Sequence, residues 1–388
     1  MKGSSATVGC ANSAPPLVPT DAAPKHIGRA PRAVAGIRPL PDPSMGDMRY
    51  QSPFRYPGAK SGLAAIIAEL VSSAAKSIGQ PQLFVEPFAG GASTALRLAG
   101  TRAVERVLLA DIDPLVARFW QVAAADTDWL IDRMWSEPVT LERWDHWRAW
   151  RPVRPSDRDI AMKCLFLNRT TFSGILHGRA GPIGGRRQDS AFKINCRFTK
   201  ESIERRLRFV GDLYRSNRLV DVWCKDWHAT LADVAEWYPQ LLPNRIIAYL
   251  DPPYLERSAR LYGRSFDLDG GYASRRGQSP AEWIGGAEHY RLAEYLRRKA
   301  QYRWLLSYDN HPGLTTDFGL YAARRMTPSV DDSGLLNVRA WRISRRLVNL
   351  RYTAANNGPS QKEELLITTL PPTTVPVNDR FRTVVEPK

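Results

Sequence analysis

The sequence is poor in cysteine and histidine, and it contains no long hydrophobic run. Four cysteines and six histidines occur in 388 residues, without a C-x-x-C pair or histidines at the spacing of zinc ligands. This scarcity argues against a disulfide scaffold and against a structural metal site. No segment reaches the roughly 20 apolar residues of a membrane span, and the N-terminus lacks the apolar core of a secretory signal. We therefore expect a soluble protein of a reducing, intracellular compartment, with no metal and no membrane contact.

Acidic residues are scarce relative to basic ones. Lys and Arg number 55 against 39 Asp and Glu, which gives a formal net charge of +16. Residues 163–218 carry 13 Lys and Arg against 4 Asp and Glu, a net charge of +9. An excess of this kind favours a polyanionic partner without proving a nucleic acid. The 43% of hydrophobic and 24% of charged residues are ordinary for a globular protein and exclude wholesale disorder, collagen-like repeats and coiled coils.

The first 47 residues have the composition of a tail. They are rich in Ala, Pro, Gly and Ser and show neither a helical nor a strand period. We expect residues 1–47 to be disordered. Met45 and Met48 stand just before the first ordered-looking sequence, which leaves open a start of translation there as the alternative to a flexible arm.

From residue 52 onward, short apolar runs alternate with helix-like segments. The runs occupy residues 83–88, 107–111, 245–251, 304–308 and 364–369, and the clearest helical segments are 114–125 and 288–301. Continuous apolar strands between helices predict an α/β fold with a parallel sheet covered on both faces. Functional residues are then expected at the carboxyl ends of the strands.

About 130 residues separate the second run from the third, far more than a crossover helix needs. The basic excess lies in this interval, so we predict an inserted module there. The expected organisation is a Rossmann-like α/β domain at 48–128 and 219–372, an inserted basic module at 129–218 and a C-terminal tail at 373–388.

The first apolar run ends in Glu86 and leads through Phe88-Ala89-Gly90-Gly91 into a helix-like segment. A glycine turn lets the backbone approach a ligand closely, with amides of the helix N-terminus facing it. Asp111 ends the next run, where a carboxylate can accept hydrogen bonds from ribose hydroxyls. Taken alone, this pattern also fits a nicotinamide-binding domain, or a tight turn with a helix-capping aspartate.

The third run ends in Asp251-Pro252-Pro253-Tyr254, which is a more specific signal. Two prolines after a strand fix a rigid turn that has no backbone donors of its own. The Asp251 carboxylate and the Pro252 carbonyl can therefore accept both hydrogens of an exocyclic amine, while the Tyr254 ring offers a face on which a planar base can stack. The alternative without a catalytic role is a strand end followed by a proline turn.

Six segments, in order, carry a family resemblance over residues 52–370. They are Phe54-Arg55-Tyr56-Pro57-Gly58-Ala59-Lys60, Phe84-Val85-Glu86-Pro87-Phe88-Ala89-Gly90-Gly91, Ala110-Asp111-Ile112-Asp113-Pro114, Phe166-Leu167-Asn168-Arg169-Thr170-Thr171-Phe172-Ser173-Gly174, Asp251-Pro252-Pro253-Tyr254 and Lys362-Glu363-Glu364-Leu365-Leu366. In sequence and order they resemble the motifs of DNA adenine-N6 methyltransferases of the deoxyadenosine-methylase type.

The resemblance implies an S-adenosylmethionine-dependent methyltransferase sheet with an inserted DNA-recognition module. It implies that the cofactor is bound by Tyr56, Gly58, Lys60, Glu86, Phe88, Ala89, Gly90, Gly91, Asp111, Asp226 and Trp227. In this family Asp111 would hold the ribose and Asp226 would meet the adenine of the cofactor. The sequence departs from the family at Ala92, where the family often has another glycine.

The implied reaction is methylation of the N6 amine of adenine at a specific site in double-stranded DNA. Asp251, Pro252 and Tyr254 are the candidate catalytic residues, because two acceptors on the amine stabilise the charge that develops as it attacks. The amine is paired inside the duplex, so the base has to be flipped out. Candidate DNA-binding residues in the basic segment are Asn168, Arg169, Arg179, Arg186, Arg187, Lys193 and Arg197.

Three alternatives remain at this point: methylation of RNA adenine, methylation of cytosine N4, and a DNA-binding protein that has kept the fold and lost catalysis. The resemblance further implies a bacterial or phage-encoded protein in the cytoplasm, associated with the nucleoid through DNA. A restriction endonuclease as partner in the cell, the recognition sequence and the oligomeric state are left open.

Overall fold

The computed structural model describes residues 52–55, 61–177, 180–253, 287–311, 314, 320–321, 343–352, 360–375 and 381–383. These residues belong to one compact unit, Asp42–Lys388. Several predicted features lie outside the described residues, namely the tail 1–47, Tyr56, Gly58, Lys60, Arg179 and Tyr254.

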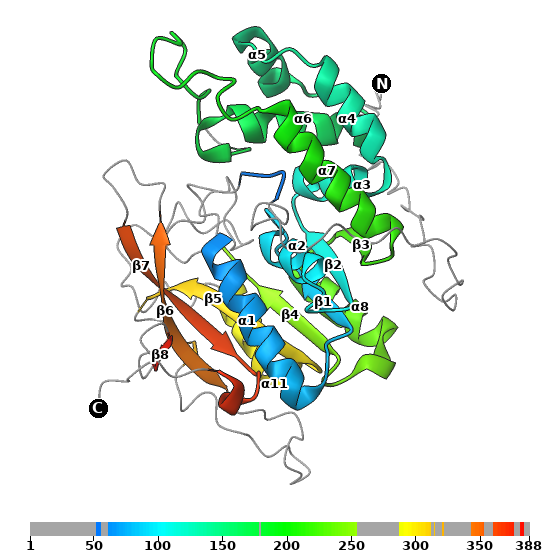
Figure 1. Ribbon diagram of the computed structural model, residues 1–388, viewed down its shortest axis with the longest axis vertical. Helices are drawn as coiled ribbons and strands as arrows, with labels where there is room; N and C mark the ends of the chain where they lie inside the picture. Colours follow the sequence, from blue (N-terminus) through cyan, green and yellow to red (C-terminus); the bar gives the residue numbers. More distant parts are fainter. Residues whose placement is uncertain are drawn as a thin grey trace, which may run out of the picture. The chain divides into compact units, whose positions relative to one another are not determined.

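The strands of the described residues form a mixed eight-stranded sheet in the order β3-β2-β1-β4-β5-β7-β6-β8 (Figure 1). The strands are β1 (Leu83–Glu86), β2 (Arg106–Asp111), β3 (Leu219–Cys224), β4 (Ile246–Leu250), β5 (Arg303–Asp309), β6 (Ser344–Tyr352), β7 (Ser360–Thr368) and β8 (Phe381–Thr383). The pairs among β3, β2, β1, β4 and β5 are parallel. The α/β class with a parallel core, predicted from the apolar runs, is confirmed.

The sheet differs from the expectation at its two sides. β7 pairs antiparallel with β5, and β6 and β8 continue the antiparallel part. An antiparallel neighbour needs only a short connection, and seven residues separate β6 from β7. The strand β3 was not predicted, because Asp221 interrupts its apolar residues. In the structure Asp221 is accommodated in the strand, where its carboxylate accepts a hydrogen bond from the Trp223 indole at 2.9 Å. Part of the segment predicted as a C-terminal tail joins the sheet, since Phe381 in β8 is fully buried.

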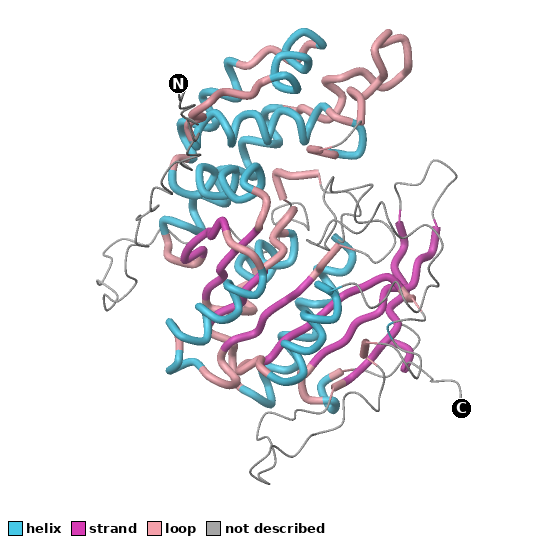
Figure 2. Tube along the Cα trace, turned by 180° about the vertical axis from the view of Figure 1, so that it is seen from behind, coloured by secondary structure: helices cyan, strands magenta, loops and turns pink. Residues whose placement is uncertain are grey.

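Side chains alternate between two apolar layers, as the period of a strand requires. Phe84, Leu109 and Tyr249 point into one layer with α1 (Ser61–Ile78), α2 (Ser93–Gly100) and α3 (Pro114–Ala125). Val85, Leu108 and Ala248 point into the other with α8 (Trp227–Trp237) and α11 (Ala287–Arg298). The labelled ribbon shows α1 in front of the strands, and Figure 2 shows the same sheet from behind. The predicted helices at 114–125 and 288–301 are thus found, and they cover opposite faces.

Four further helices lie between β2 and β3, inside the interval for which an inserted module was predicted. They are α4 (Thr127–Ser136), α5 (Leu141–Ala149), α6 (Asp157–Thr170) and α7 (Lys200–Arg215). Short 3-10 turns occur at η2 (Phe172–Gly174), η3 (Pro239–Leu241) and η5 (Pro372–Thr374). α3 packs against α6 and α7, and the buried side chains of this interval belong to the same apolar core as those of α1 and α2.

Local sequence explains where these helices begin. Asp113 accepts a hydrogen bond from the Leu115 amide at 3.0 Å, and Pro114 occupies the first turn of α3. Thr140 and Ser156 cap α5 and α6 in the same way, each accepting an amide of the first turn. Side-chain oxygens at these positions satisfy donors that a helix start leaves unpaired.

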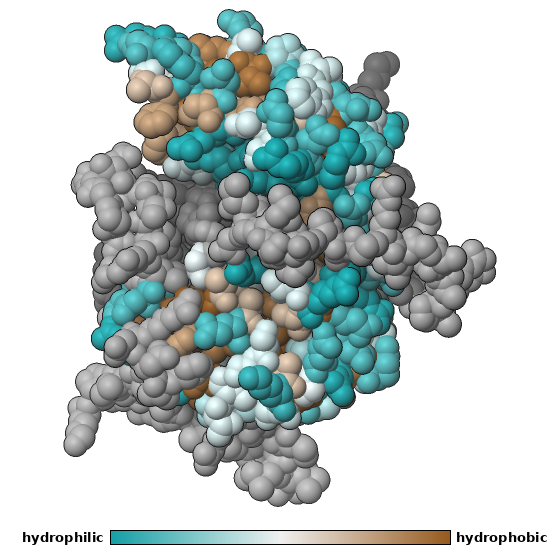
Figure 3. All heavy atoms as spheres, in the orientation of Figure 1, coloured by the Kyte–Doolittle hydropathy of each residue, from teal (hydrophilic) through white to brown (hydrophobic). Residues whose placement is uncertain are grey.

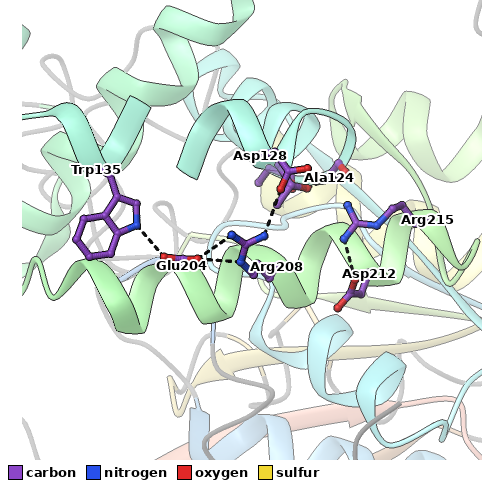
Figure 4. A network of polar contacts seen from close by, with 9 residues as sticks. Ala124, Asp128, Trp135, Glu204, Arg208, Asp212 and Arg215 are labelled. Carbon is purple, nitrogen blue, oxygen red and sulfur yellow. Dashed lines mark hydrogen bonds and ion pairs between the residues drawn. The ribbon is translucent and has the colours of Figure 1, made fainter. Parts of the chain in front are cut away.

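Polar contacts fix the outer side of α7 against α4 (Figure 4). The Trp135 indole donates to Glu204 at 2.7 Å, and Arg208 pairs with Glu204 at 2.8 Å and with Asp128 at 3.3 Å. The visible surface over α7 is hydrophilic in the space-filling view (Figure 3). Exposed ion pairs of this kind contribute little stability, so they align the two helices more than they hold the fold together. None of the helices in the described ranges combines the length and the apolarity that a membrane span needs.

Candidate active site

Acidic residues stand at the carboxyl ends of all five parallel strands. Following the sheet order, they are Asp226 after β3, Asp111 in β2, Glu86 in β1, Asp251 after β4 and Asp309 in β5. The chain leaves β1 toward β2 on one side and reaches β4 on the other, so β1 and β4 flank the switch point of the sheet. Ligands of open α/β sheets bind in the crevice at this point. Glu86 and Asp251 therefore border the expected site.

The turn after β1 is held by its neighbours. The Ala89 amide donates to the Ala110 carbonyl at 2.9 Å, and the Gly90 amide donates to Asp111 Oδ2 at 2.9 Å. Gly90 has a φ of 42°, which an L side chain rarely adopts. From α3, the buried Trp120 indole donates to the Gly90 carbonyl at 2.9 Å. Side chains from β2 and α3 thus fix the path of the glycine turn.

Ala92, which stands where the family pattern often has glycine, adopts a backbone conformation that favours glycine. Its φ is 48° and its ψ is 26°, in the left-handed region that favours glycine. The side chain is buried directly before α2. The alanine therefore occupies a backbone position that suits glycine.

The Asp111 carboxylate is buried at the end of β2, and each of its oxygens accepts a backbone amide. Oδ2 accepts from Gly90 and Oδ1 accepts from Asp113, both at 2.9 Å. Burial, with the nearby Asp113, raises the pKa of Asp111 to about 7, while the two amide hydrogen bonds and His177 oppose this rise. Asp111 is thus oriented by the backbone and changes its charge near neutral pH.

The basic segment reaches this edge through His177. Its Nε2 lies 2.5 Å from Oδ2 of Asp113, the residue that caps α3. Because Asp113 lies two residues after Asp111, this contact ties the segment between β2 and β3 to the predicted ribose carboxylate. No signal in the sequence singled out His177.

Glu86 is buried on the same side of the sheet as Tyr249. Its Oε2 accepts a hydrogen bond from the Ala95 amide, in the first turn of α2, at 3.1 Å. Burial raises the pKa of Glu86 well above its usual range, and the charges of Asp251 and Asp111 act in the same direction. Glu86 therefore fixes the start of α2 from the end of β1.

Asp251 is half-buried and is held from the neighbouring strand. The Ser307 hydroxyl of β5 donates to Asp251 Oδ1 at 3.1 Å. Pro252 is buried and Pro253 is half-buried directly after it. Among the described residues, the Asp251-Pro252-Pro253 turn thus lies at the switch point, with Asp251 Oδ1 held by Ser307.

Asp226 and Trp227 are neighbours in sequence, but their side chains have different partners. Asp226 caps α8, because its Oδ1 accepts the amides of His228 at 2.9 Å and of Ala229 at 3.0 Å. Within the described part of the chain, the second oxygen, Oδ2, makes no hydrogen bond. Trp227 is buried, and its indole donates to Glu288 at 3.2 Å. The structure gives Trp227 a packing role between α8 and α11.

The structure departs from the expectation of direct DNA contact at Asn168 and Arg169. Asn168 is fully buried at the end of α6. Its Oδ1 accepts from the Arg55 amide, and its Nδ2 donates to the carbonyls of Arg55 and Gly174, at 2.7, 2.7 and 3.2 Å. Asn168 therefore clamps the segment before Tyr56. A side chain with these bonds inside the fold cannot reach DNA.

Arg169 is 6% exposed and lies among other guanidinium groups. Burial lowers the pKa of Arg169 to about 9, with further lowering by the charges of Arg206, Arg55 and Arg197. Arg169 Nε and Arg55 Nη1 are buried without a hydrogen-bond partner among the described residues. Arg169 thus contributes a buried positive charge close to Arg55, Arg197 and Arg206.

Four predicted DNA-binding residues are exposed on the loop of residues 180–199, which we call the basic loop. Arg186 pairs with Asp145 at 2.5 Å, and Arg187, whose side chain is 88% exposed, pairs with Asp189 at 3.1 Å. Lys193 donates to the Gln188 carbonyl, and the Arg197 guanidinium lies 5.9 Å from the centre of the Phe192 ring. These cations are accessible, as DNA contacts require.

The geometry identifies two residues that the sequence reasoning missed. Ser307 supports Asp251, and Ile112, between Asp111 and Asp113, is 46% exposed at the carboxyl end of β2. The sequence carried a weak signal for each, because Ile112 follows a strand-ending acid and Ser307 is a polar residue inside an apolar run. The described residues contain no cluster of His, Cys, Asp or Glu suited to a metal ion.

A comparison with protein families identifies the reaction class of the site at the carboxyl ends of the strands. The family of D12 class N6 adenine-specific DNA methyltransferases matches residues 56–271, more than half of the chain. The chain belongs to this family. No match is found among curated proteins.

A D12 class enzyme methylates the N6 amine of adenine in DNA, so the chain is an adenine-specific DNA methyltransferase. The matched range contains the glycine turn, Asp111, the basic loop and the Asp251-Pro252-Pro253 turn. The prediction of DNA adenine methylation is confirmed. The alternatives of RNA adenine, cytosine N4, nicotinamide binding and a DNA-binding protein without catalysis are not supported.

Proposed function

We propose that this D12 class methyltransferase uses S-adenosylmethionine to methylate adenine at a specific site in double-stranded DNA, with the reaction at the carboxyl ends of β1 and β4. The observation that carries the proposal is the position of Asp251 and Pro252 at the switch point, beside the turn that follows Glu86. The acceptors for an amine and the glycine turn that can approach a nucleoside thus lie at the same edge of the sheet.

The residues around Asp111 fit S-adenosylmethionine. Asp111 offers carboxylate oxygens to ribose hydroxyls, and the Gly90 turn brings backbone close to the same place. Ile112 provides an exposed apolar surface for an adenine ring, and Asp226 Oδ2 can accept its amine. The predicted contacts of Tyr56, Gly58 and Lys60 belong to the same proposal. When bound, the cofactor supplies a methyl group on a sulfonium, which is already electrophilic.

The chain contributes acceptors and position to the transfer. The adenine amine is a poor nucleophile because its lone pair is delocalised into the ring. The Asp251 carboxylate and the Pro252 carbonyl accept its two hydrogens, which favours a pyramidal amine and stabilises the positive charge of attack. Asp251 then takes up the proton that the amine loses. Tyr254 completes the site as a stacking platform, and alignment of the reacting atoms provides much of the remaining rate.

DNA binding is assigned to the basic loop. Its exposed cations face solvent, and their surface ion pairs with Asp145 and Asp189 are weak enough for a phosphate to replace the acid. The target base has to leave the stack, which costs a few kcal/mol, on the order of 2–4. Contacts to several phosphates provide the free energy that offsets this cost.

The direct test is transfer of labelled methyl from S-adenosylmethionine to unmethylated DNA, followed by digestion to nucleosides and sequencing of the modified positions. We expect N6-methyladenine at one short sequence. Label on another base, or adenine labelled irrespective of sequence, would contradict the proposed specificity.

Cofactor affinity is expected to depend on pH through Asp111. The ionised carboxylate accepts hydrogen bonds from both ribose hydroxyls, whereas the protonated form loses an acceptor. Because the pKa of free Asp111 is about 7, affinity should fall as the pH drops below about 7, approaching about tenfold per pH unit. Calorimetric titration of S-adenosylmethionine between about pH 5.5 and 8.5 measures the trend.

Asp113→Asn is the matched variant for this prediction. The asparagine can still cap α3, and it removes the negative charge that raises the pKa of Asp111. The midpoint of the pH dependence should therefore move to lower pH. An affinity that stays constant over this range would contradict the role of Asp111.

Removing two exposed cations from the basic loop should weaken DNA binding. Arg186→Ala with Arg187→Ala is expected to lower affinity about tenfold and to reduce the slope of log affinity against log salt by about 2, because each phosphate contact contributes about 0.9. Fluorescence anisotropy at several salt concentrations measures both. Arg298→Ala with Lys299→Ala, at the C-terminal end of α11, removes the same charge at the opposite edge of the sheet and should leave the slope unchanged. Equal slopes for wild type and the loop variant would place the DNA elsewhere.

A further inference from the structure

Two hydroxyls form a hydrogen-bonded chain that ends on Asp251. Tyr249 and Asp251 are two residues apart, so their side chains lie on the same side of the sheet. Ser307 comes from the adjacent strand, where Tyr249 pairs with Leu305 and Leu250 with Leu306. The Tyr249 hydroxyl lies 2.9 Å from Ser307 Oγ, and Ser307 Oγ lies 3.1 Å from Asp251 Oδ1.

The order of donors in this chain follows from its chemistry. A carboxylate only accepts, so Ser307 donates its single proton to Asp251. Ser307 Oγ can then accept from Tyr249, and burial raises the pKa of Tyr249 well above its usual range, so this phenol keeps its proton. The chain therefore runs in one direction, from Tyr249 through Ser307 to Asp251.

The surroundings show why this chain is more than a feature of packing. Ser307 is 1% exposed, and Trp304, Leu305 and Leu306 precede it in β5 as fully buried apolar residues. A hydroxyl in such a place costs free energy unless it is hydrogen-bonded. An alanine would fill this position in the buried strand equally well. The hydrogen bond to Asp251 therefore explains the serine.

We propose that Ser307, supported by Tyr249, is a positioning residue that fixes the rotation of the Asp251 carboxylate for the adenine amine. This inference rests on the proposed role of Asp251. With Oδ1 held from β5, the plane of the carboxylate is set before substrate arrives. Glu86, a second buried acid, ends the neighbouring strand β1 on the same side of the sheet, so a rotated carboxylate would also meet another acidic group.

Ser307→Ala should lower kcat by about 10- to 100-fold, because a misplaced catalytic group costs about this factor. The Kd for DNA and for S-adenosylmethionine should stay within about twofold, since Ser307 is buried in β5 and acts through Asp251. The acid limb of the kcat profile should move to higher pH, because the ionised carboxylate loses a donor.

Ser307→Thr keeps the hydroxyl and should restore most of the rate and the original acid limb. Tyr249→Phe should lower kcat by a smaller factor, about 2- to 5-fold, and should have no further effect once Ser307 is alanine. Ser344→Ala is the matched control, because it removes a buried serine hydroxyl from β6 of the same sheet and should leave kcat and the pH profile unchanged.

Two results would overturn the inference. One is a Ser307→Ala enzyme whose kcat is within twofold of wild type. The other is a fall in kcat with an unmoved acid limb, which would give Ser307 a purely structural role. Asp251→Ala, measured in parallel, separates this inference from the proposed function. If Asp251→Ala is inactive and Ser307→Ala is normal, only the positioning role fails, whereas an active Asp251→Ala enzyme removes the basis of both.

Discussion

Replacing Asp251 with alanine is expected to lower methyl transfer by about 10³-fold. The variant loses the carboxylate that we propose accepts an amine hydrogen and takes up the proton, while the Pro252 carbonyl would keep one acceptor in place. DNA affinity should stay within a few-fold of wild type, because the basic loop is unchanged. Single-turnover transfer of labelled methyl, with anisotropy for DNA binding, measures the two quantities separately.

Asp132→Ala is the control for the loss of one negative charge. Asp132 is exposed on α4 and belongs neither to the catalytic turn nor to the basic loop, so this variant should transfer methyl at the wild-type rate. Turnover of Asp251→Ala near the wild-type rate would show that the amine is held by other groups.

Asn168→Ala should reduce the free energy of unfolding by about 2–4 kcal/mol, because backbone groups of Arg55 and Gly174 lose their partner inside the protein. Cofactor affinity should fall as well, since Arg55 directly precedes the predicted cofactor segment at Tyr56, Gly58 and Lys60. Urea unfolding followed by circular dichroism measures the first effect, and calorimetric titration measures the second.

The exposed Asn195 provides a matched control in the basic loop. Its side chain makes no hydrogen bond within the described part of the chain, and Asn195→Ala should change stability by less than about 0.5 kcal/mol. If Asn168→Ala were as stable as this control, the clamp would contribute nothing to stability, and a loss of DNA affinity alone would make Asn168 a DNA contact.

Local signals predicted a large part of the fold. β1, β2, β4 and β5 follow apolar runs, and α3 begins where Asp113 and Pro114 predict a helix start. These features depend on neighbours in the chain, which a sequence displays directly. β3 was missed because a single acid, Asp221, breaks its pattern at the edge of the sheet.

The candidate site divides in the same way. Asp251-Pro252 and the turn at Gly90 were recognisable because the backbone chemistry of proline and glycine is local. The place of Ser307 was not, because its contact with Asp251 spans 56 positions of sequence. Asn168 and Arg169 were predicted to contact DNA because their residue types suit phosphate. The structure buries both side chains, and a residue type alone does not reveal burial.

The sequence by itself determined the class of fold, the acids that end the strands and the family of the enzyme, since each rests on residue types in short, ordered segments. Only the tertiary structure decided that β4 lies beside β1, which makes Glu86 and Asp251 neighbours, and that β7 enters antiparallel. It also decided which cations face solvent and which lie inside. The physical reason is that pairing of distant strands and burial depend on contacts between remote segments, whose free energies no local pattern contains.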